Sequence, residues 1–134
     1  MAKDYKIFIS HSWKYPEDLK NLQNLLNQRG YFNVEFKEAS QEQPINSLSA
    51  AYIKAVLKKK ILDSDVVLAI SGIYASHSEW IEWEILTSHS NNIPIIGVAP
   101  WGQERISTTV TKYSVTDVRW NTESIVQAIR TYAK

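Results

Sequence analysis

Short apolar runs alternate along the chain with longer segments in which apolar residues recur every three or four positions. The short runs predict strands and the longer segments predict helices. The predicted strands are Tyr5–Ser10, Phe32–Lys37, Asp65–Ser71, Ile93–Ala99 and, more weakly, Asp117–Trp120. The third and fourth runs are almost continuously apolar, which is typical of strands buried on both faces in a parallel sheet covered by helices.

Three of the helical segments carry clear apolar stripes. These stripes are formed by Leu19, Leu22, Leu25 and Leu26, by Tyr52, Ile53, Val56 and Leu57, and by Ile125, Ala128, Ile129 and Tyr132. Gly30 is expected to end the first helix and Asn121 to cap the last one.

Five β–α units follow one another without a linker or a repeat, so we expect residues 1–134 to form a single domain. The alternation predicts an α/β fold: a flavodoxin-like, doubly wound, five-stranded parallel sheet between two layers of helices. Ligands of this architecture bind beyond the carboxyl ends of the strands. The functional residues are therefore expected in the loops that follow Ser10, Lys37, Ser71 and Ala99.

Composition narrows the classes of function. The 134 residues carry a formal net charge of +1, which argues against nucleic acid as a partner. Without cysteine there can be no disulfide framework, cysteine-bound zinc or thiol catalysis, and we predict no metal site. No apolar run is long enough for a signal peptide or a membrane span, so we expect a cytoplasmic protein without a membrane partner.

The loop after the first strand excludes three common occupants of this fold. No glycine precedes Gly30, so the chain has neither the phosphate loop of a flavodoxin nor a G-x-G-x-x-G dinucleotide loop. The acidic residues of a receiver domain are also missing, because Ser10, His11 and Ser71 stand in their places.

Two loops contain candidate binding groups. Ser10, His11 and Ser12 can hydrogen-bond a ribose or a phosphate, although the same residues also suit a turn that caps the next helix. The polar segment 38–47, with Pro44, is either a lid over the site or a solvated loop.

The helix that begins near residue 79 contains the most informative residue. Its apolar arc comprises Trp80, Ile81 and Ile85. At ~100° per residue Glu84 projects into the middle of this arc, whereas Glu79 and Glu82 lie on the opposite side. A carboxylate on a buried face costs several kcal/mol unless it is hydrogen-bonded or lines a cavity. Glu84 is therefore either a functional acid or a structural acid paired with a buried cation or amide.

These features together resemble a TIR domain. The resemblance rests on the opening YKIFISHS (5–12), on Ser78-Glu79-Trp80 at the start of the helix, on the Trp-x-x-x-Glu spacing of Trp80 and Glu84, and on the strand at 93–97. Among TIR proteins, the chain is most similar to the small bacterial TIR-like proteins of the Thoeris anti-phage system. The likeness extends over essentially the whole sequence.

The resemblance implies an enzyme that cleaves the nicotinamide–ribose bond of NAD+. NAD+ is then a substrate and no cofactor is expected. In the Thoeris branch the product is a cyclic ADP-ribose-type signal that activates a separate effector protein, and the enzyme self-associates on activation. Glu84 would be the catalytic carboxylate, which holds the hydroxyls of the nicotinamide ribose and stabilises positive charge at its anomeric carbon. The resemblance places Phe8, Ser10, His11, Ser12, Ser71, Ser76 and Trp80 around the substrate and Pro44 at the centre of the mobile BB loop.

The sequence departs from the pattern of receptor TIR domains at two places, and two functions other than NAD+ cleavage are considered. The segment 38–47 lacks the Arg-Asp-x-x-Pro-Gly box of receptor TIR domains, and the first loop lacks an acidic residue that many of them carry. A noncatalytic TIR module that signals by self-association is one alternative. A nucleoside deoxyribosyltransferase, which shares the fold and a catalytic glutamate, is the other. The product isomer, the phage trigger and the oligomeric state are not encoded in any motif.

Overall fold

The computed structural model describes residues 4–10, 16–29, 33–37, 50–71, 79–99 and 108–133. The strands are β1 (Asp4–Ser10), β2 (Asn33–Lys37), β3 (Val66–Ile70), β4 (Ile95–Val98) and β5 (Thr116–Val118). The helices are α1 (Pro16–Asn27), α2 (Ala50–Leu62), α3 (Glu79–Ser90), α4 (Thr108–Tyr113) and α5 (Thr122–Tyr132).

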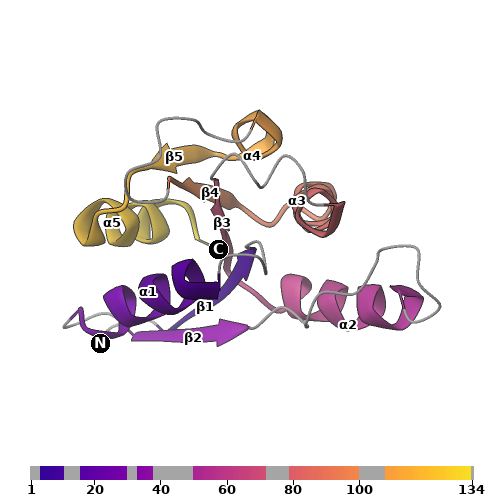
Figure 1. The fold of residues 1–134 in the computed structure, drawn as a ribbon, viewed down its shortest axis with the longest axis horizontal. Coiled ribbons are helices and arrows are strands. Elements are labelled where there is room, and N and C mark those ends of the chain that lie inside the picture. Colours follow the sequence, from indigo (N-terminus) through magenta and orange to yellow (C-terminus); the bar gives the residue numbers. More distant parts are fainter. Residues whose placement is uncertain are drawn as a thin grey trace.

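The five strands form one parallel sheet in the order β2-β1-β3-β4-β5 (Figure 1). This order confirms the predicted flavodoxin-like, doubly wound fold. All five predicted strands are present with shifts of one or two residues at their ends, and the weak fifth strand begins and ends slightly earlier than predicted.

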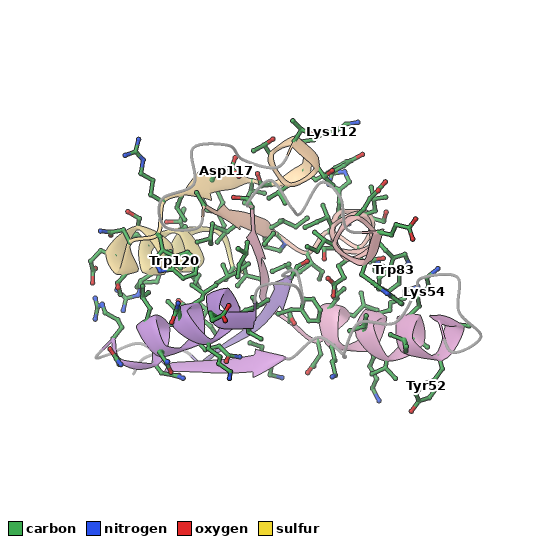
Figure 2. All side chains as sticks on the ribbon, in the orientation of Figure 1. Tyr52, Lys54, Trp83, Lys112, Asp117 and Trp120 are labelled. Atoms are coloured by element: carbon green, nitrogen blue, oxygen red, sulfur yellow. The ribbon has the colours of Figure 1, made fainter. Side chains whose placement is uncertain are left out.

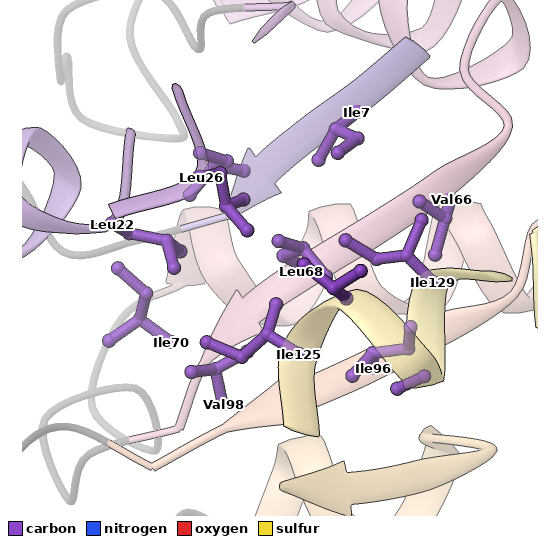
Figure 3. Close-up of a cluster of buried hydrophobic side chains, with 13 residues drawn as sticks. Ile7, Leu22, Leu26, Val66, Leu68, Ile70, Ile96, Val98, Ile125 and Ile129 are labelled. Carbon is purple, nitrogen blue, oxygen red and sulfur yellow. The ribbon is translucent and has the colours of Figure 1, made fainter. Parts of the chain in front are cut away.

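Helices cover both faces of the sheet, as the three-layer prediction requires. On one face, α1 and α5 pack on a cluster of aliphatic side chains from β1, β3 and β4 (Figure 3). On the other face, residues of α2, α3 and α4 form a second cluster with Phe8, Val67, Ala69 and Ile95. Neighbouring residues of β1 and β3 belong to opposite clusters, because successive side chains of a strand point to opposite faces.

The stripes of α1 and α5 are confirmed at most positions, but two predicted core residues are wrong. Tyr52 is 75% exposed and projects away from the rest of the molecule (Figure 2). It lies in the first turn of α2, and only Leu57 and Ile61, nearer to β3, are fully covered in that helix. Tyr132 is also exposed, because it lies in the last turn of α5.

The predicted cap of α5 is confirmed. The side chain of Asn121 accepts a hydrogen bond of 3.0 Å from the backbone N–H of Ser124, which satisfies one of the free donors at the start of the helix. Gly30, predicted to end α1, lies outside the described residues.

Candidate active site

The order in which strands are added to the sheet reverses between β1 and β3. In doubly wound folds, ligand sites lie at this kind of reversal. The two strands are neighbours in the sheet, with Ser10 opposite Ala69, yet the helices that follow them lie on opposite faces. Ligands of doubly wound sheets bind at such a divergence, beyond the carboxyl ends of the two strands. Ser10 ends β1 at this position, and Ser71 directly follows β3.

Glu84 lies on the buried face of α3, and its carboxyl group reaches the last residue of β1. Its exposed fraction is only 3%, whereas Glu79 and Glu82 of the same helix are exposed. The Ser10 hydroxyl donates a hydrogen bond of 2.9 Å to Glu84 Oε1. Two candidate residues 74 positions apart in the sequence are thus in direct contact.

The environment of Glu84 disfavours its charged form. Burial raises the pKa of the Glu84 carboxyl from its ordinary 4.5 to about 8, and the hydrogen bond from Ser10 opposes this effect by stabilising the carboxylate. Within the described ranges no lysine, arginine or histidine forms an ion pair with Glu84. Its Oε2 atom also accepts no hydrogen bond there.

These contacts separate the two interpretations of Glu84. A structural buried acid needs a cation or several donors to offset its desolvation. In the parts of the chain that the structure describes, Glu84 has one hydroxyl donor and no cation. Such an acid, buried with a strongly shifted pKa and with no cation among the described residues, is a typical candidate for a functional group.

Ser71, two residues beyond the β3 residue that lies opposite Ser10, is also fully buried. Its Oγ atom makes no hydrogen bond to any residue that the structure describes. A buried hydroxyl without a partner costs about 1–3 kcal/mol relative to a satisfied one. Most buried polar groups in native proteins are satisfied, so this exception needs an explanation.

Two apolar residues of the predicted site lie in the cluster that α3 covers. Phe8 is fully buried in the cluster beneath α3, and Trp80, one turn before Glu84, is 8% exposed. The Trp80 ring meets the Trp83 ring edge to face, with centroids 6.0 Å apart. Phe8 and Trp80 therefore belong to the apolar cluster on the face of the sheet that α3 covers.

The remaining predicted residues, His11, Ser12, Pro44 and Ser76, lie outside the described residues. Among the residues that are described, no three acidic or histidine side chains come together as metal ligands. No helix in the described ranges is long and apolar enough to cross a membrane.

One neighbour of the acid was not predicted from the sequence. Ser88 is buried on the same face of α3, and its hydroxyl donates a 2.7 Å hydrogen bond to the backbone carbonyl of Glu84. The spacing of four residues was the available signal, since side chains at this spacing share a helix face. A serine that bonds back by one turn commonly bends a helix slightly.

The strand order and the two layers of helices define a flavodoxin-like α/β domain with a buried acid at the carboxyl edge of its sheet. A family profile described as "Thoeris protein ThsB, TIR-like domain" matches residues 8–105, more than half of the chain. The chain therefore belongs to the ThsB TIR-like family of Thoeris proteins. The matched range includes Ser10, Ser71 and Glu84, with the last three residues of β1 and all of β3 and α3.

Comparison with solved structures supports the fold. A 2-deoxyribosyltransferase from the psychrotolerant bacterium Bacillus psychrosaccharolyticus is similar with a TM-score of 0.66 and 16% identity over 90% of this chain and 89% of that one. A conserved protein from Enterococcus faecalis V583 has a TM-score of 0.66 and 12% identity, with 96% and 99% of the two chains covered. A CMP N-glycosidase from Clostridium botulinum has a TM-score of 0.56 and 14% identity, with 93% and 98% covered. No curated protein sequence matches the chain.

Proposed function

We propose that this protein is an NAD+-consuming enzyme that cleaves the bond between nicotinamide and ribose, with Glu84 as the catalytic residue. The observation that carries the proposal is the burial of Glu84 without a cationic partner in the described part of the chain, at the carboxyl edge of the sheet. Membership of the ThsB TIR-like family supports the proposal independently.

A single carboxylate suits this reaction. Most glycosidases need two carboxyl groups, because one must protonate the leaving group. The nicotinamide of NAD+ carries a positive charge and departs as a neutral base when the electron pair of the glycosidic bond moves to its nitrogen. The remaining task is to stabilise positive charge at the ribose carbon, and a carboxylate in a site with little water does this well.

The raised pKa of Glu84 is compatible with this role. A cation placed beside a carboxyl group favours its ionised form and lowers its pKa. The pyridinium ring of NAD+ would supply that cation, so substrate binding would itself promote ionisation of Glu84. The free protein would then hold the acid largely neutral near pH 7, and the substrate complex would hold it charged.

The other candidate residues take supporting roles in this proposal. Phe8 and Trp80 are buried in the apolar cluster beneath α3. In this proposal they keep water from the acid, and Trp80 forms one wall of the substrate pocket, as the TIR resemblance implies. His11, Ser12, Pro44 and Ser76 border the substrate, as the TIR resemblance implies. The product is a cyclic ADP-ribose-type signal for a separate effector protein in anti-phage defence, and the enzyme self-associates when activated.

A second candidate function is transfer or hydrolysis at the N-glycosidic bond of a nucleoside or nucleotide. Two proteins of similar fold are named a 2-deoxyribosyltransferase and a CMP N-glycosidase. Both this function and NAD+ cleavage would use Glu84. Incubation with deoxynucleosides and with CMP separates them, because base release from these compounds without nicotinamide release from NAD+ would favour the second function.

The test of the proposal is nicotinamide release by protein purified from phage-infected cells. The parent is compared with Glu84→Gln, which preserves shape but not charge, and with Glu79→Gln, an exposed acid of the same helix. We expect release by the parent and Glu79→Gln, and a loss of at least about 100-fold in Glu84→Gln. Equal release by the parent and Glu84→Gln contradicts the role of Glu84, and no release by any of the three favours a noncatalytic signalling module.

A further inference from the structure

Four of the serines that the structure describes are fully or almost fully buried, and Ser71 differs from the other three. Ser10 donates to Glu84, Ser64 donates to the Lys60 carbonyl at 2.7 Å, and Ser88 donates to the Glu84 carbonyl. The Ser71 hydroxyl has no such partner among the described residues. Burial alone therefore does not explain why the Ser71 hydroxyl lacks a hydrogen bond, because the hydroxyls of the other three buried serines are all bonded.

The backbone places the Ser71 side chain on the same face of the sheet as Glu84. The Ser71 N–H donates to the Val98 carbonyl at 2.9 Å, which continues the ladder between β3 and β4 by one residue. The alternation of β3 therefore extends to Ser71, which shares the face of Val67 and Ala69 beneath α3.

The register also gives the position of Ser71 along the sheet relative to Ser10. Ala69 lies opposite Ser10, the residue that contacts Glu84. Ser71 is two residues farther along β3, ~6.6 Å nearer to the carboxyl edge at the usual rise of a parallel strand. Ser71 therefore lies nearer to the ligand-binding edge of the sheet than Ser10, the hydrogen-bond partner of Glu84.

We propose that the Ser71 hydroxyl binds one hydroxyl group of the nicotinamide ribose of NAD+ and determines the specificity of the site for a ribosyl substrate. This inference rests on the proposed function and adds a specificity residue to it. A serine hydroxyl both donates and accepts, which matches the hydroxyl of a sugar. A site with a buried polar group of this kind rejects an analogue without the matching hydroxyl, because the group then stays unpaired.

Stability provides the first test, because it requires no substrate. Ser71→Ala removes an unpaired hydroxyl, so we expect a melting temperature equal to or higher than that of the parent. Ser64→Ala is the matched control: this serine lies at the other end of β3 and its hydroxyl is bonded, so its loss should lower the melting temperature by about 3 °C or more. A fall for Ser71→Ala as large as that for Ser64→Ala would show that its hydroxyl is bonded, and would overturn the inference.

Ligand affinity provides the decisive test. Glu84→Gln, which leaves NAD+ uncleaved under the proposed function, is titrated with NAD+ and with its analogues that lack the 2′ or the 3′ hydroxyl of the nicotinamide ribose. We expect one analogue to bind at least about tenfold more weakly than NAD+. In the double variant Glu84→Gln with Ser71→Ala, the affinity for NAD+ should fall to that for the analogue. The difference in affinity between NAD+ and the analogue should then disappear.

Two failures are distinguishable in this experiment. The role of Ser71 is overturned if Ser71→Ala leaves the affinity for NAD+ unchanged, or if it lowers the affinities for NAD+ and both analogues equally. In either case, nicotinamide release by the parent still upholds the proposed function. Absence of both NAD+ binding and nicotinamide release overturns the proposed function and the role of Ser71 together.

Discussion

Glu84 combines nearly complete burial with a single hydroxyl donor, and this combination has consequences at the scale of one residue. Its carboxyl group has a pKa of about 8 in the folded protein and an ordinary value of 4.5 when the chain is unfolded. Between these two values the folded state binds a proton that the unfolded state does not. The contribution of Glu84 to folding stability is therefore greatest at acidic pH and is lost as the pH rises toward 8.

We therefore predict that the free energy of unfolding falls by roughly 1 kcal/mol per pH unit between about pH 5 and pH 7.5 because of Glu84. Glu84→Gln removes the titration, so this variant should depend less on pH and be more stable than the parent at pH 8 and above. Chemical denaturation at several pH values measures the effect. The exposed Glu82→Gln serves as the control and should keep the slope of the parent, and a parental slope in Glu84→Gln would contradict the assignment.

Ser10 should act through Glu84. Its hydrogen bond lowers the pKa of Glu84, so Ser10→Ala should raise that pKa further. If the ionised acid is the active form, kcat/KM for NAD+ rises with pH to a plateau above about pH 8 in the parent, and the midpoint moves upward in Ser10→Ala. A change in the plateau without movement of the midpoint would mean that Ser10 does not tune the acid.

Among the helices and strands, α3 shows what could be predicted from the sequence and what could not. Helical periodicity alone places Trp80, Ile81, Glu84 and Ile85 on one face, and all four are buried. The partner of Glu84 could not be derived in this way, because Ser10 is 74 residues away and meets the acid only through the packing of α3 on the sheet. The resemblance to TIR domains grouped the two residues at one site but gave no contact between them.

The cap of α5 allows an independent test of local structure. Asn121→Ala removes the side-chain acceptor of the Ser124 N–H and should lower the free energy of unfolding by about 1 kcal/mol. Gln127→Ala, at an exposed position in the middle of the same helix, should change it by less than about 0.5 kcal/mol. Equal effects of the two substitutions would show that the cap does not contribute.

Gly97 of β4 leaves little space for a side chain beside β5 and α4. A Cβ atom on Gly97 would collide with Oδ1 of Asp117, its partner in the sheet, and would lie 3.1 Å from a methyl group of Val110. Gly97→Ala should therefore cost about 1–3 kcal/mol of stability. The double variant with Asp117→Ala should recover part of this loss, and a purely additive result would contradict the proposed collision.

At the scale of the whole molecule, the order of elements was more predictable than the extent of the core. Alternating strands and helices sufficed for the fold, since right-handed crossovers leave few arrangements of five parallel strands. Periodicity placed Tyr52 in the core, but the first turn of α2 lies where the sheet no longer covers it, and the residue is exposed. Which helical turns reach the sheet depends on tertiary packing, which a local pattern does not contain.

The most direct test of the proposed function uses intact cells. Small molecules from phage-infected cells that express the parent or Glu84→Gln are compared by mass spectrometry. We expect a cyclic ADP-ribose-type compound together with free nicotinamide in cells with the parent, and neither above background in cells with Glu84→Gln. The same compounds at equal levels in both cultures, or in neither, would contradict the assignment of Glu84 as the catalytic residue of an NAD+-cleaving enzyme.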